Sequence, residues 1–385
     1  MLKQKKYNKE SFFHNNIMKR NTHSLNIIFS LLAFFVISML SIYSAKSITS
    51  DSMGNIFIKQ LIFYGVGVIV LFFTYRFKKE IIKFSFLWYI GFCFLLLVLL
   101  FIGTSINGSK CWLIIGPVSF QPSEFMKIAL ILVLAKVLDK YKRVKKMSKE
   151  FKMLLLVFTL FIIPAILTFL EPDTGVVIIY FIIMLSMLLF RGINKKWYFI
   201  VLILLTIIGG IIGYLYFFQN ELLINLLGSN LFYRIERVLN WSNQSGYQLE
   251  NSLIAIGSSG LVGFGFNQIP IYYPEASTDF IFTTFSSNFG FLGNLFFIII
   301  ILVFDINILL LSNKKIKKYD QYLLIGIFAM LLYQQVQNIS MTIGLLPITG
   351  ITLPFISYGG SSLLSYMFIA GLVLRISNDS KRYIN

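Results

Sequence analysis

The sequence predicts an all-α integral membrane protein with about ten transmembrane helices. The 385 residues are 57% hydrophobic and 13% charged, whereas a soluble domain has about 25% charged residues. The mean hydropathy is +0.78. The sequence contains repeated apolar runs whose lengths approach the roughly 20 residues that a helix needs to cross a bilayer. These runs lack the alternation of polar and apolar residues that is typical of a strand. This composition excludes an ordinary cytosolic enzyme, a disordered protein and a collagen-like chain.

Ten apolar segments are expected to form the membrane helices, and the fourth and sixth are the shortest. They cover residues 24–45, 55–75, 82–103, 122–138, 153–171, 174–190, 197–218, 286–312, 320–344 and 355–376. The first follows a basic tail, residues 1–23, and its apolar part is nearer to about 20 residues than to the 7–15 of a cleavable signal peptide. We therefore expect it to be a retained signal anchor.

The basic residues predict the orientation. The formal net charge is +18, and 27 of the 34 lysines and arginines lie in segments that fall on one side if ten helices alternate. Because cytoplasmic loops carry the excess of Lys and Arg, that side is expected to be the cytoplasm and to hold both termini. The charge thus indicates topology and contact with anionic lipids, and no nucleic-acid partner is expected.

One membrane domain is expected over residues 24–376, between the N-terminal tail and a cytoplasmic C-terminal tail, residues 377–385. A large extracytoplasmic loop, residues 219–285, would join the seventh and eighth helices. This loop contains Trp241 and apolar clusters, so we expect it to be ordered and packed on the membrane face.

The sequence also limits the chemistry. Cys93 and Cys111 are lone cysteines, and both histidines, His14 and His23, precede the membrane domain. These counts disfavour a disulfide framework or a thiolate zinc site, and they exclude a Ser-His-Asp triad. Acid or base catalysis would have to use Asp, Glu, Lys or Tyr.

Two acidic motifs lie at predicted helix ends on the outer side. In Phe120–Lys127, Pro122 and Ser123 are typical of a helix start, and Glu124 and Lys127 lie three residues apart on one helical face. They form either a structural ion pair or the wall of a polar cavity. In Leu170–Gly175, Glu171 and Asp173 are either solvated turn carboxylates or ligands of a cation.

A third motif, Tyr273–Phe282, places Asp279 just before the eighth helix, at the membrane boundary. Asp279 is either a helix N-cap or a partly desolvated carboxylate with a raised pKa, suited to act as a general base on a sugar hydroxyl. A fourth stretch, Gly344–Ser362, concentrates Gly, Pro and Ser, which mark breaks or tight contacts in membrane helices. Its Gly359 and Gly360 are more typical of backbone packing than of ligand binding.

Together these motifs, in this order, resemble the SEDS family of RodA/FtsW/SpoVE-type proteins over about residues 24–376. The matching blocks are Asn107-Gly-Ser-Lys-Cys-Trp112, Gln121-Pro-Ser-Glu-Phe-Met-Lys127, Glu171-Pro-Asp-Thr-Gly175 (Gln-Pro-Asp-x-Gly in the family), Ile254-Ala-Ile-Gly257, Pro274-Glu-Ala-Ser-Thr-Asp-Phe-Ile-Phe282, and Leu346-Pro-Ile-Thr-Gly350 through Pro354-Phe-Ile-Ser-Tyr-Gly-Gly-Ser-Ser362. The last block is the most specific.

The resemblance implies a peptidoglycan glycosyltransferase that polymerises lipid II at the outer face of the bacterial cell membrane and releases undecaprenyl pyrophosphate. It implies a class B penicillin-binding protein, a transpeptidase, as partner, together with other elongation or division proteins. Asp279 matches the catalytic aspartate of the family, and Glu124, Lys127 and Trp112 match residues of its central cavity. Further substrate or cavity positions are Gln121, Ser123, Glu275, Thr278, Arg234, Arg237, Ser357, Gly359 and Gly360. A divalent cation, Mg or Mn, could bridge the pyrophosphate to a carboxylate.

The chain departs from the family where two consecutive glutamates usually follow the aspartate motif, because Ser287 and Asn288 stand there. The loop before Pro274 also lacks the usual Lys or Arg. Two alternative functions therefore stay open. One is a flippase or transporter of a lipid-linked precursor, and the other is a low-activity scaffold that regulates a penicillin-binding protein. The acidic residues favour the enzyme over the transporter because they gather at the outer face.

Overall fold

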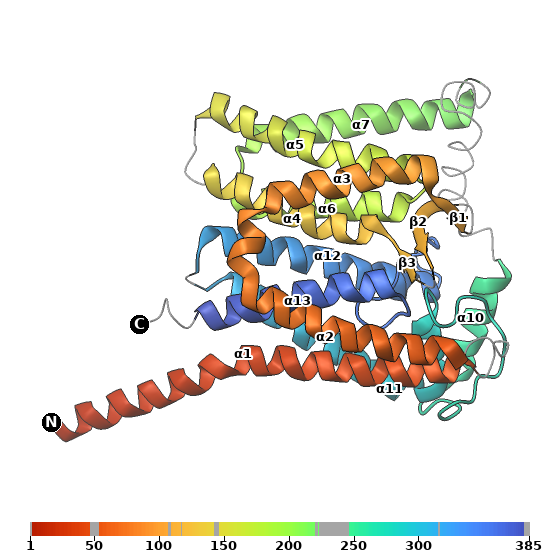
Figure 1. Ribbon diagram of the computed structural model, residues 1–385, viewed down its shortest axis with the longest axis horizontal. Coiled ribbons are helices and arrows are strands. Elements are labelled where there is room, and N and C mark those ends of the chain that lie inside the picture. Colours follow the sequence, from red (N-terminus) through yellow and green to blue (C-terminus); the bar gives the residue numbers. More distant parts are fainter. Residues whose placement is uncertain are drawn as a thin grey trace.

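The protein is seen here in a computed structural model, which describes residues 2–46, 54–106, 109–116, 118–141, 146–219, 222, 246–314 and 316–380. The described residues are mostly helical, and the long helices lie side by side in a bundle (Figure 1). The N- and C-terminal ends lie at one end of this bundle, whereas three strands and a short helix lie at the other (Figure 1). We call the latter the strand end.

Each of the ten apolar segments coincides over most of its length with one long helix. In chain order the helices are α1 (Leu2–Ala45), α2 (Gly54–Lys83), α3 (Ser85–Ile102), α4 (Pro122–Lys140), α5 (Met147–Leu170), α6 (Thr174–Arg191), α7 (Lys195–Phe218), the short α10 (Tyr247–Ser258), α11 (Ile281–Ser312), α12 (Lys318–Thr342) and α13 (Gly360–Ser380). Eight of them are long and apolar enough to cross a membrane, and α4 and α7 are not among these eight. The prediction of a mostly helical membrane chain is confirmed at this level.

Several predicted boundaries are wrong. We expected the second apolar segment to end at residue 75, but α2 extends to Lys83, past a kink at the non-helical residue Phe77. Lys, Arg and Glu are good helix formers, so a charged end can prolong an apolar helix. We expected the last helix to begin at 355, but α13 begins at Gly360 and continues to Ser380, into the predicted tail.

The segment between α3 and α4 contains strands that the sequence analysis missed. The strands β1 (Thr104–Ile106), β2 (Ser109–Ile115) and β3 (Val118–Phe120) form a small antiparallel sheet in the order β1-β2-β3. Leu113 pairs with Phe120 across β2 and β3. The sheet leads directly into Gln121 and the start of α4, so it fixes the position at which α4 begins.

Helix α4 lies in the core, where nearly all of its residues are buried. Helix α13 packs against both α4 and α2, and small residues allow α13 and α2 to approach closely. An added Cβ at Gly371 would overlap Thr74 Oγ1, and one at Gly67 would lie 2.8 Å from Met367 Cγ. The polar groups of α4 are therefore held inside the bundle rather than exposed to lipid.

The predicted large loop, residues 219–285, is described from residue 246 onward. This part contains α10 and a compact series of turns that ends at α11. Leu249, Asn251, Ser252 and Ala255 of α10 are buried, so the described part is packed against the bundle, as the ordered-loop prediction expects. Trp241 lies outside the described residues.

Candidate functional site

Asp279 lies in the turn that precedes α11, and hydrogen bonds to its backbone neighbours hold this turn. The Tyr358 amide donates to the Ser277 carbonyl at 2.9 Å. Ser357 Oγ donates to the Thr278 carbonyl at 2.7 Å and accepts from the Leu353 amide at 2.8 Å. The Asp279 motif is thus fixed to the Gly/Pro/Ser-rich segment before α13, although about 80 residues separate them along the chain.

Asn338 of α12 forms a second attachment, which the sequence analysis missed. Its side-chain amide donates to the Asp279 carbonyl at 2.9 Å and to the Ile351 carbonyl at 2.8 Å. Asn338 is fully buried, and buried carbonyls without a partner are costly. The available signal was the run of polar amides in an otherwise apolar segment, which also includes Gln334, Gln335 and Gln337.

The Asp279 carboxylate does not cap α11. The N-cap of α11 is Phe280, and no side chain caps this helix, so the N-cap interpretation of Asp279 is wrong. Burial, reinforced by the nearby Glu275 carboxylate, raises the pKa of Asp279 to about 7. Within the described residues its carboxylate has no hydrogen bond or ion pair, and it can therefore accept a proton near neutral pH.

Gly350 lies beside this carboxylate. It has a positive φ of 71°, and an added Cβ would lie 3.5 Å from Asp279 Oδ2. A side chain at this position would thus be strained and would narrow the space in front of the carboxylate. Glu275, which is exposed, accepts a hydrogen bond from Thr278 Oγ1, so both of these predicted site residues lie next to Asp279.

Glu124 and Lys127 form a buried ion pair in the first turns of α4. Lys127 Nζ lies 2.8 Å from Glu124 Oε2, and both side chains are almost inaccessible to solvent. Ser365 Oγ donates to the same Glu124 oxygen at 3.4 Å. Lys127 also lies over the Tyr366 ring, 5.5 Å from its centroid. The two charges thus compensate each other inside the bundle.

Asp173 joins this pair to the turn between α5 and α6. Gln121 Nε2 donates to Asp173 Oδ2 at 3.2 Å, and the Val176 amide donates to Oδ1, so Asp173 caps α6. Burial raises the pKa of Asp173 to about 6, and the nearby Glu124 carboxylate contributes to the increase. Asp173, which was expected to be a solvated turn carboxylate or a cation ligand, thus lies in the same polar site as Gln121.

The burial of Glu171 contradicts the prediction that this residue is a solvated turn carboxylate. Its side chain is fully buried, and neither carboxylate oxygen has a hydrogen-bond partner among the described residues. Burial, with the adjacent Asp173 as a second cause, raises the pKa of Glu171 to about 8. The group is therefore a neutral carboxylic acid at pH 7.

The segment 349–352 lies beside Asp279 on one side and beside Tyr366, a neighbour of Lys127, on the other. Gly350 lies against the Asp279 carboxylate, while an added Cβ at Gly175 would lie 3.0 Å from Ile351 Cγ1 and 3.3 Å from the Thr349 carbonyl. On the other side, Thr352 Oγ1 lies 3.5 Å from Tyr366 OH. One short stretch of backbone thus separates the unpaired carboxylate from the buried ion pair.

Four further predicted site residues take structural positions. Ser123 is buried, and its carbonyl accepts a hydrogen bond from Tyr180 OH at 3.2 Å. Trp112 lies in β2, where its carbonyl accepts from Thr104 Oγ1. Gly359 and Gly360 face α2: the Gly359 amide donates to Gln60 Oε1, and an added Cβ at Gly360 would lie 2.9 Å from the Phe63 ring.

Two predicted phosphate contacts, Arg234 and Arg237, lie outside the described residues. Ser287 and Asn288 are buried in α11 just before its non-helical residue, Gly290. Asn288 Oδ1 accepts from Ser44 Oγ of α1 at 2.9 Å. The two positions at which the family resemblance implies glutamates are thus occupied by packed, uncharged side chains.

The described residues contain no group of three or more His, Cys, Asp or Glu side chains that could hold a metal ion. Asp279 and Glu275 form only a pair, and Asp173 is engaged by Gln121 and the end of α6. The side chains in this part of the chain do not form a complete cation site of their own.

Residues 24–382 match the family of cell cycle proteins that comprises FtsW, RodA and SpoVE. The chain belongs to this FtsW/RodA/SpoVE family. Over 371 residues it is 34% identical to a probable peptidoglycan glycosyltransferase FtsW of Coxiella burnetii, covering 92% of this chain and 96% of that protein. It is 33% identical to the stage V sporulation protein E of Bacillus subtilis, with 94% and 99% covered. Family membership and the apolar helices together establish a multi-pass membrane protein.

Solved structures of this family share the fold. The similarity to a chain of a peptidoglycan synthase complex that coordinates polymerization and crosslinking has a TM-score of 0.74 at 23% identity, and it covers 92% of this chain and 97% of that chain. The rod shape determining protein RodA of Thermus thermophilus aligns with a TM-score of 0.65 at 23% identity, over 92% and 96% of the two chains.

Proposed function

We propose that the protein is a peptidoglycan glycosyltransferase that polymerises lipid II, with Asp279 as the general base. The relatives named as peptidoglycan glycosyltransferases support the reaction class. The observation that carries the assignment of the base is the Asp279 carboxylate, which is rigidly positioned, lacks a partner among the described residues and has a pKa near neutrality.

The reaction follows from this geometry. Asp279 would take the proton from the 4-hydroxyl of the acceptor N-acetylglucosamine, and the resulting oxygen would attack the anomeric carbon of the donor sugar. The new glycosidic bond forms as the bond to pyrophosphate breaks, with inversion, and undecaprenyl pyrophosphate leaves with the electron pair. The hydrogen bonds from Ser357 and Asn338 hold the base in place, so little reorganisation is needed in the transition state.

The buried Lys127 supplies positive charge on the far side of segment 349–352, next to Glu124 and Tyr366. We propose that these groups line the cavity for the substrate and that Gln121 and Asp173 extend its polar wall. A divalent cation at the pyrophosphate stays a prediction, because the described side chains offer no complete site for it.

In the membrane, we propose ten spanning helices, α1–α7 and α11–α13, with both termini in the cytoplasm and the strand end outside. The excess of Lys and Arg at the opposite end supports this orientation. A class B penicillin-binding protein is the proposed partner, as the similarity to a chain of a synthase complex suggests. Its transpeptidase activity would crosslink the strands that this chain makes.

The test is polymerisation of lipid II by the purified protein, alone and with the penicillin-binding protein, in wild type and in Asp279→Asn. We expect glycan strands from the wild type and none from the variant, which should remain folded because the carbonyl of residue 279 still accepts from Asn338. Full activity of Asp279→Asn would remove Asp279 from the mechanism. No polymer from the wild type under either condition would favour the scaffold function instead.

A further inference from the structure

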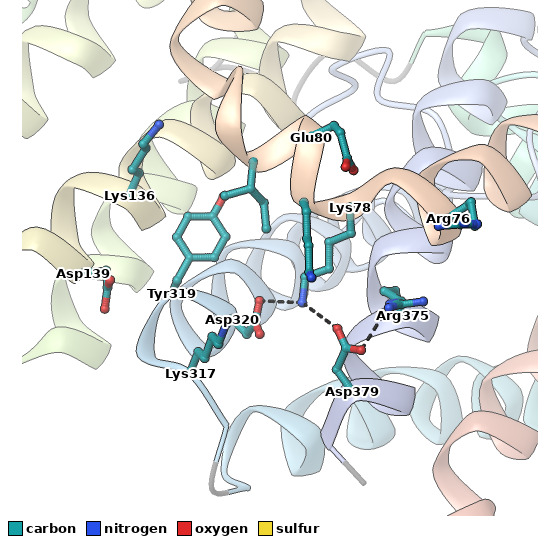
Figure 2. Close-up of a pocket in the computed structure, with 12 residues that line it drawn as sticks. Arg76, Lys78, Glu80, Lys136, Asp139, Lys317, Tyr319, Asp320, Arg375 and Asp379 are labelled. Carbon is teal, nitrogen blue, oxygen red and sulfur yellow. Dashed lines mark ion pairs between the residues drawn. The ribbon is translucent and has the colours of Figure 1, made fainter. Parts of the chain in front are cut away.

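A charged cavity lies at the end of the bundle opposite the strand end. Its volume is about 540 Å³, and it is lined by residues from α2, α4, α12 and α13 (Figure 2). The cavity takes no part in the chemistry proposed for Asp279, which lies near the strand end. The order of the helices brings together here the charged ends of four helices that are distant in sequence.

An ion-pair network forms the floor of this cavity. Lys78 Nζ lies 2.8 Å from Asp320 Oδ1 and 3.5 Å from Asp379 Oδ2, and Arg375 Nε lies 3.2 Å from Asp379 Oδ1 (Figure 2). Two basic and two acidic side chains compensate each other in this network. Because Lys78 and Asp320 are buried, the network fixes α2, α12 and α13 relative to one another.

The other charged residues that line the cavity carry an excess of positive charge. They comprise four cationic side chains and two acidic ones: Arg76, Lys79, Lys136, Lys317, Glu80 and Asp139. Lys79 and Lys317 are exposed, and neither forms an ion pair among the described residues. The rim of the cavity therefore presents two exposed ammonium groups that an anion could engage.

Exposed aromatic side chains adjoin the cationic rim. Phe77, Phe84 and Phe86 are all exposed at the same end of α2 and the start of α3. Arg76 lies over the Phe77 ring, and Lys136 lies 5.6 Å from the centroid of Phe86. Cationic groups and an apolar surface thus lie next to each other, as at the boundary between lipid headgroups and acyl chains.

We propose that this cavity binds the phosphate headgroup of an anionic glycerophospholipid, whose acyl chains lie along the exposed phenylalanines of α2 and α3. Basic pockets between membrane helices bind such headgroups in general. A free phosphate ion would use only the cations, and it would leave the adjoining aromatic surface without a role. The bound lipid would connect α2, α12 and α13 at the end of the bundle where the proposed cytoplasmic face lies.

The experiment measures how tightly the full-length protein in detergent retains phosphatidylglycerol, by native mass spectrometry with phosphatidylcholine as the neutral reference. We expect Lys79→Gln combined with Lys317→Gln to weaken the retention of phosphatidylglycerol roughly fivefold per lysine, without a change for phosphatidylcholine. Lys79→Arg combined with Lys317→Arg should retain the lipid within about twofold, because the charge is kept.

The matched control is Lys149→Gln combined with Lys152→Gln, which removes the same charge from exposed positions of α5 outside the cavity. This control should retain phosphatidylglycerol as the wild type does, and inorganic phosphate at the same concentration as the lipid should not displace it. Equal losses in the two double glutamine variants, or displacement by inorganic phosphate, would overturn the proposal. The measurement does not depend on polymerisation, so its outcome is separate from that of the Asp279 test.

Discussion

Substitution of Glu171 by Gln should make the protein more stable at alkaline pH while changing little at acidic pH. Gln has nearly the same shape but cannot ionise, and it is the residue that the family pattern has at this place. In the wild type, the buried carboxyl of Glu171 has no hydrogen-bond partner among the described residues, and its pKa is raised from 4.5 to about 8.

The magnitude follows from proton linkage. Between pH 4.5 and 8, the unfolded chain loses the proton of Glu171 while the folded protein keeps it. The contribution of this group to stability is therefore complete below the unfolded pKa and decreases by about 1.4 kcal/mol per pH unit as the pH rises. The decrease ends above the folded pKa, at a total of up to roughly 5 kcal/mol. The Gln variant has no such loss.

The assay is thermal unfolding of the purified protein in detergent at several pH values from 5 to 9. We expect the difference in melting temperature between Glu171→Gln and wild type to increase with pH and to level off above about pH 8. Glu250→Gln is the matched control, since Glu250 is exposed on α10, and it should melt in parallel with the wild type. Parallel melting profiles for Glu171→Gln and wild type would refute the reasoning.

Three further predictions concern the polar site. The wild-type polymerisation rate should rise about tenfold per pH unit below pH 7 and level off above it, because Asp279 must be ionised to act as a base; a flat profile would contradict this role. Lys127→Gln should destabilise the protein by about 3–5 kcal/mol, because it leaves Glu124 buried and unpaired; melting curves should show partial recovery when Glu124→Gln is added. Asn338→Ala should cost about 1–3 kcal/mol and lower the polymerisation rate beyond that loss, since the Asp279 and Ile351 carbonyls lose their donor; unchanged kinetics would exclude positioning.

The helices could be predicted from the sequence because burial in lipid acts on each segment by itself. An apolar run of sufficient length must form all its backbone hydrogen bonds internally, so the run and the helix coincide. The ends of the helices are less strongly determined by the sequence. The second segment was expected to end at residue 75, but α2 continues past a kink at Phe77 to Lys83, because a charged helix end is stable in water when its neighbours bind it. The sheet β1–β3 was missed, since its short strands gain their hydrogen bonds only from one another.

The residues that carry the site were found by motif, but their environments could not be predicted. Glu171 appeared to be an exposed turn residue, but it is buried, and its carbonyl accepts a hydrogen bond from Cys111 of β2, which is far away in sequence. Asn338 joins Asp279 to Ile351 across three separate parts of the chain. Only the tertiary structure brings these partners together, and a hydrogen bond leaves no periodic pattern in the sequence.

These environments also explain why Asp279 is the group suited to exchange a proton near neutral pH. Glu124 is held by Lys127, Asp173 accepts hydrogen bonds from Gln121 and from the first turn of α6, and Glu171 is kept neutral by burial. Each of these carboxyl groups is thus committed to a partner or to one protonation state. The Asp279 carboxylate, which no described side chain engages, has a pKa of about 7 and is only partly buried, whereas the unpartnered Glu171 is fully buried. A base catalyst requires both properties, because a proton must be able to arrive and to leave at the working pH.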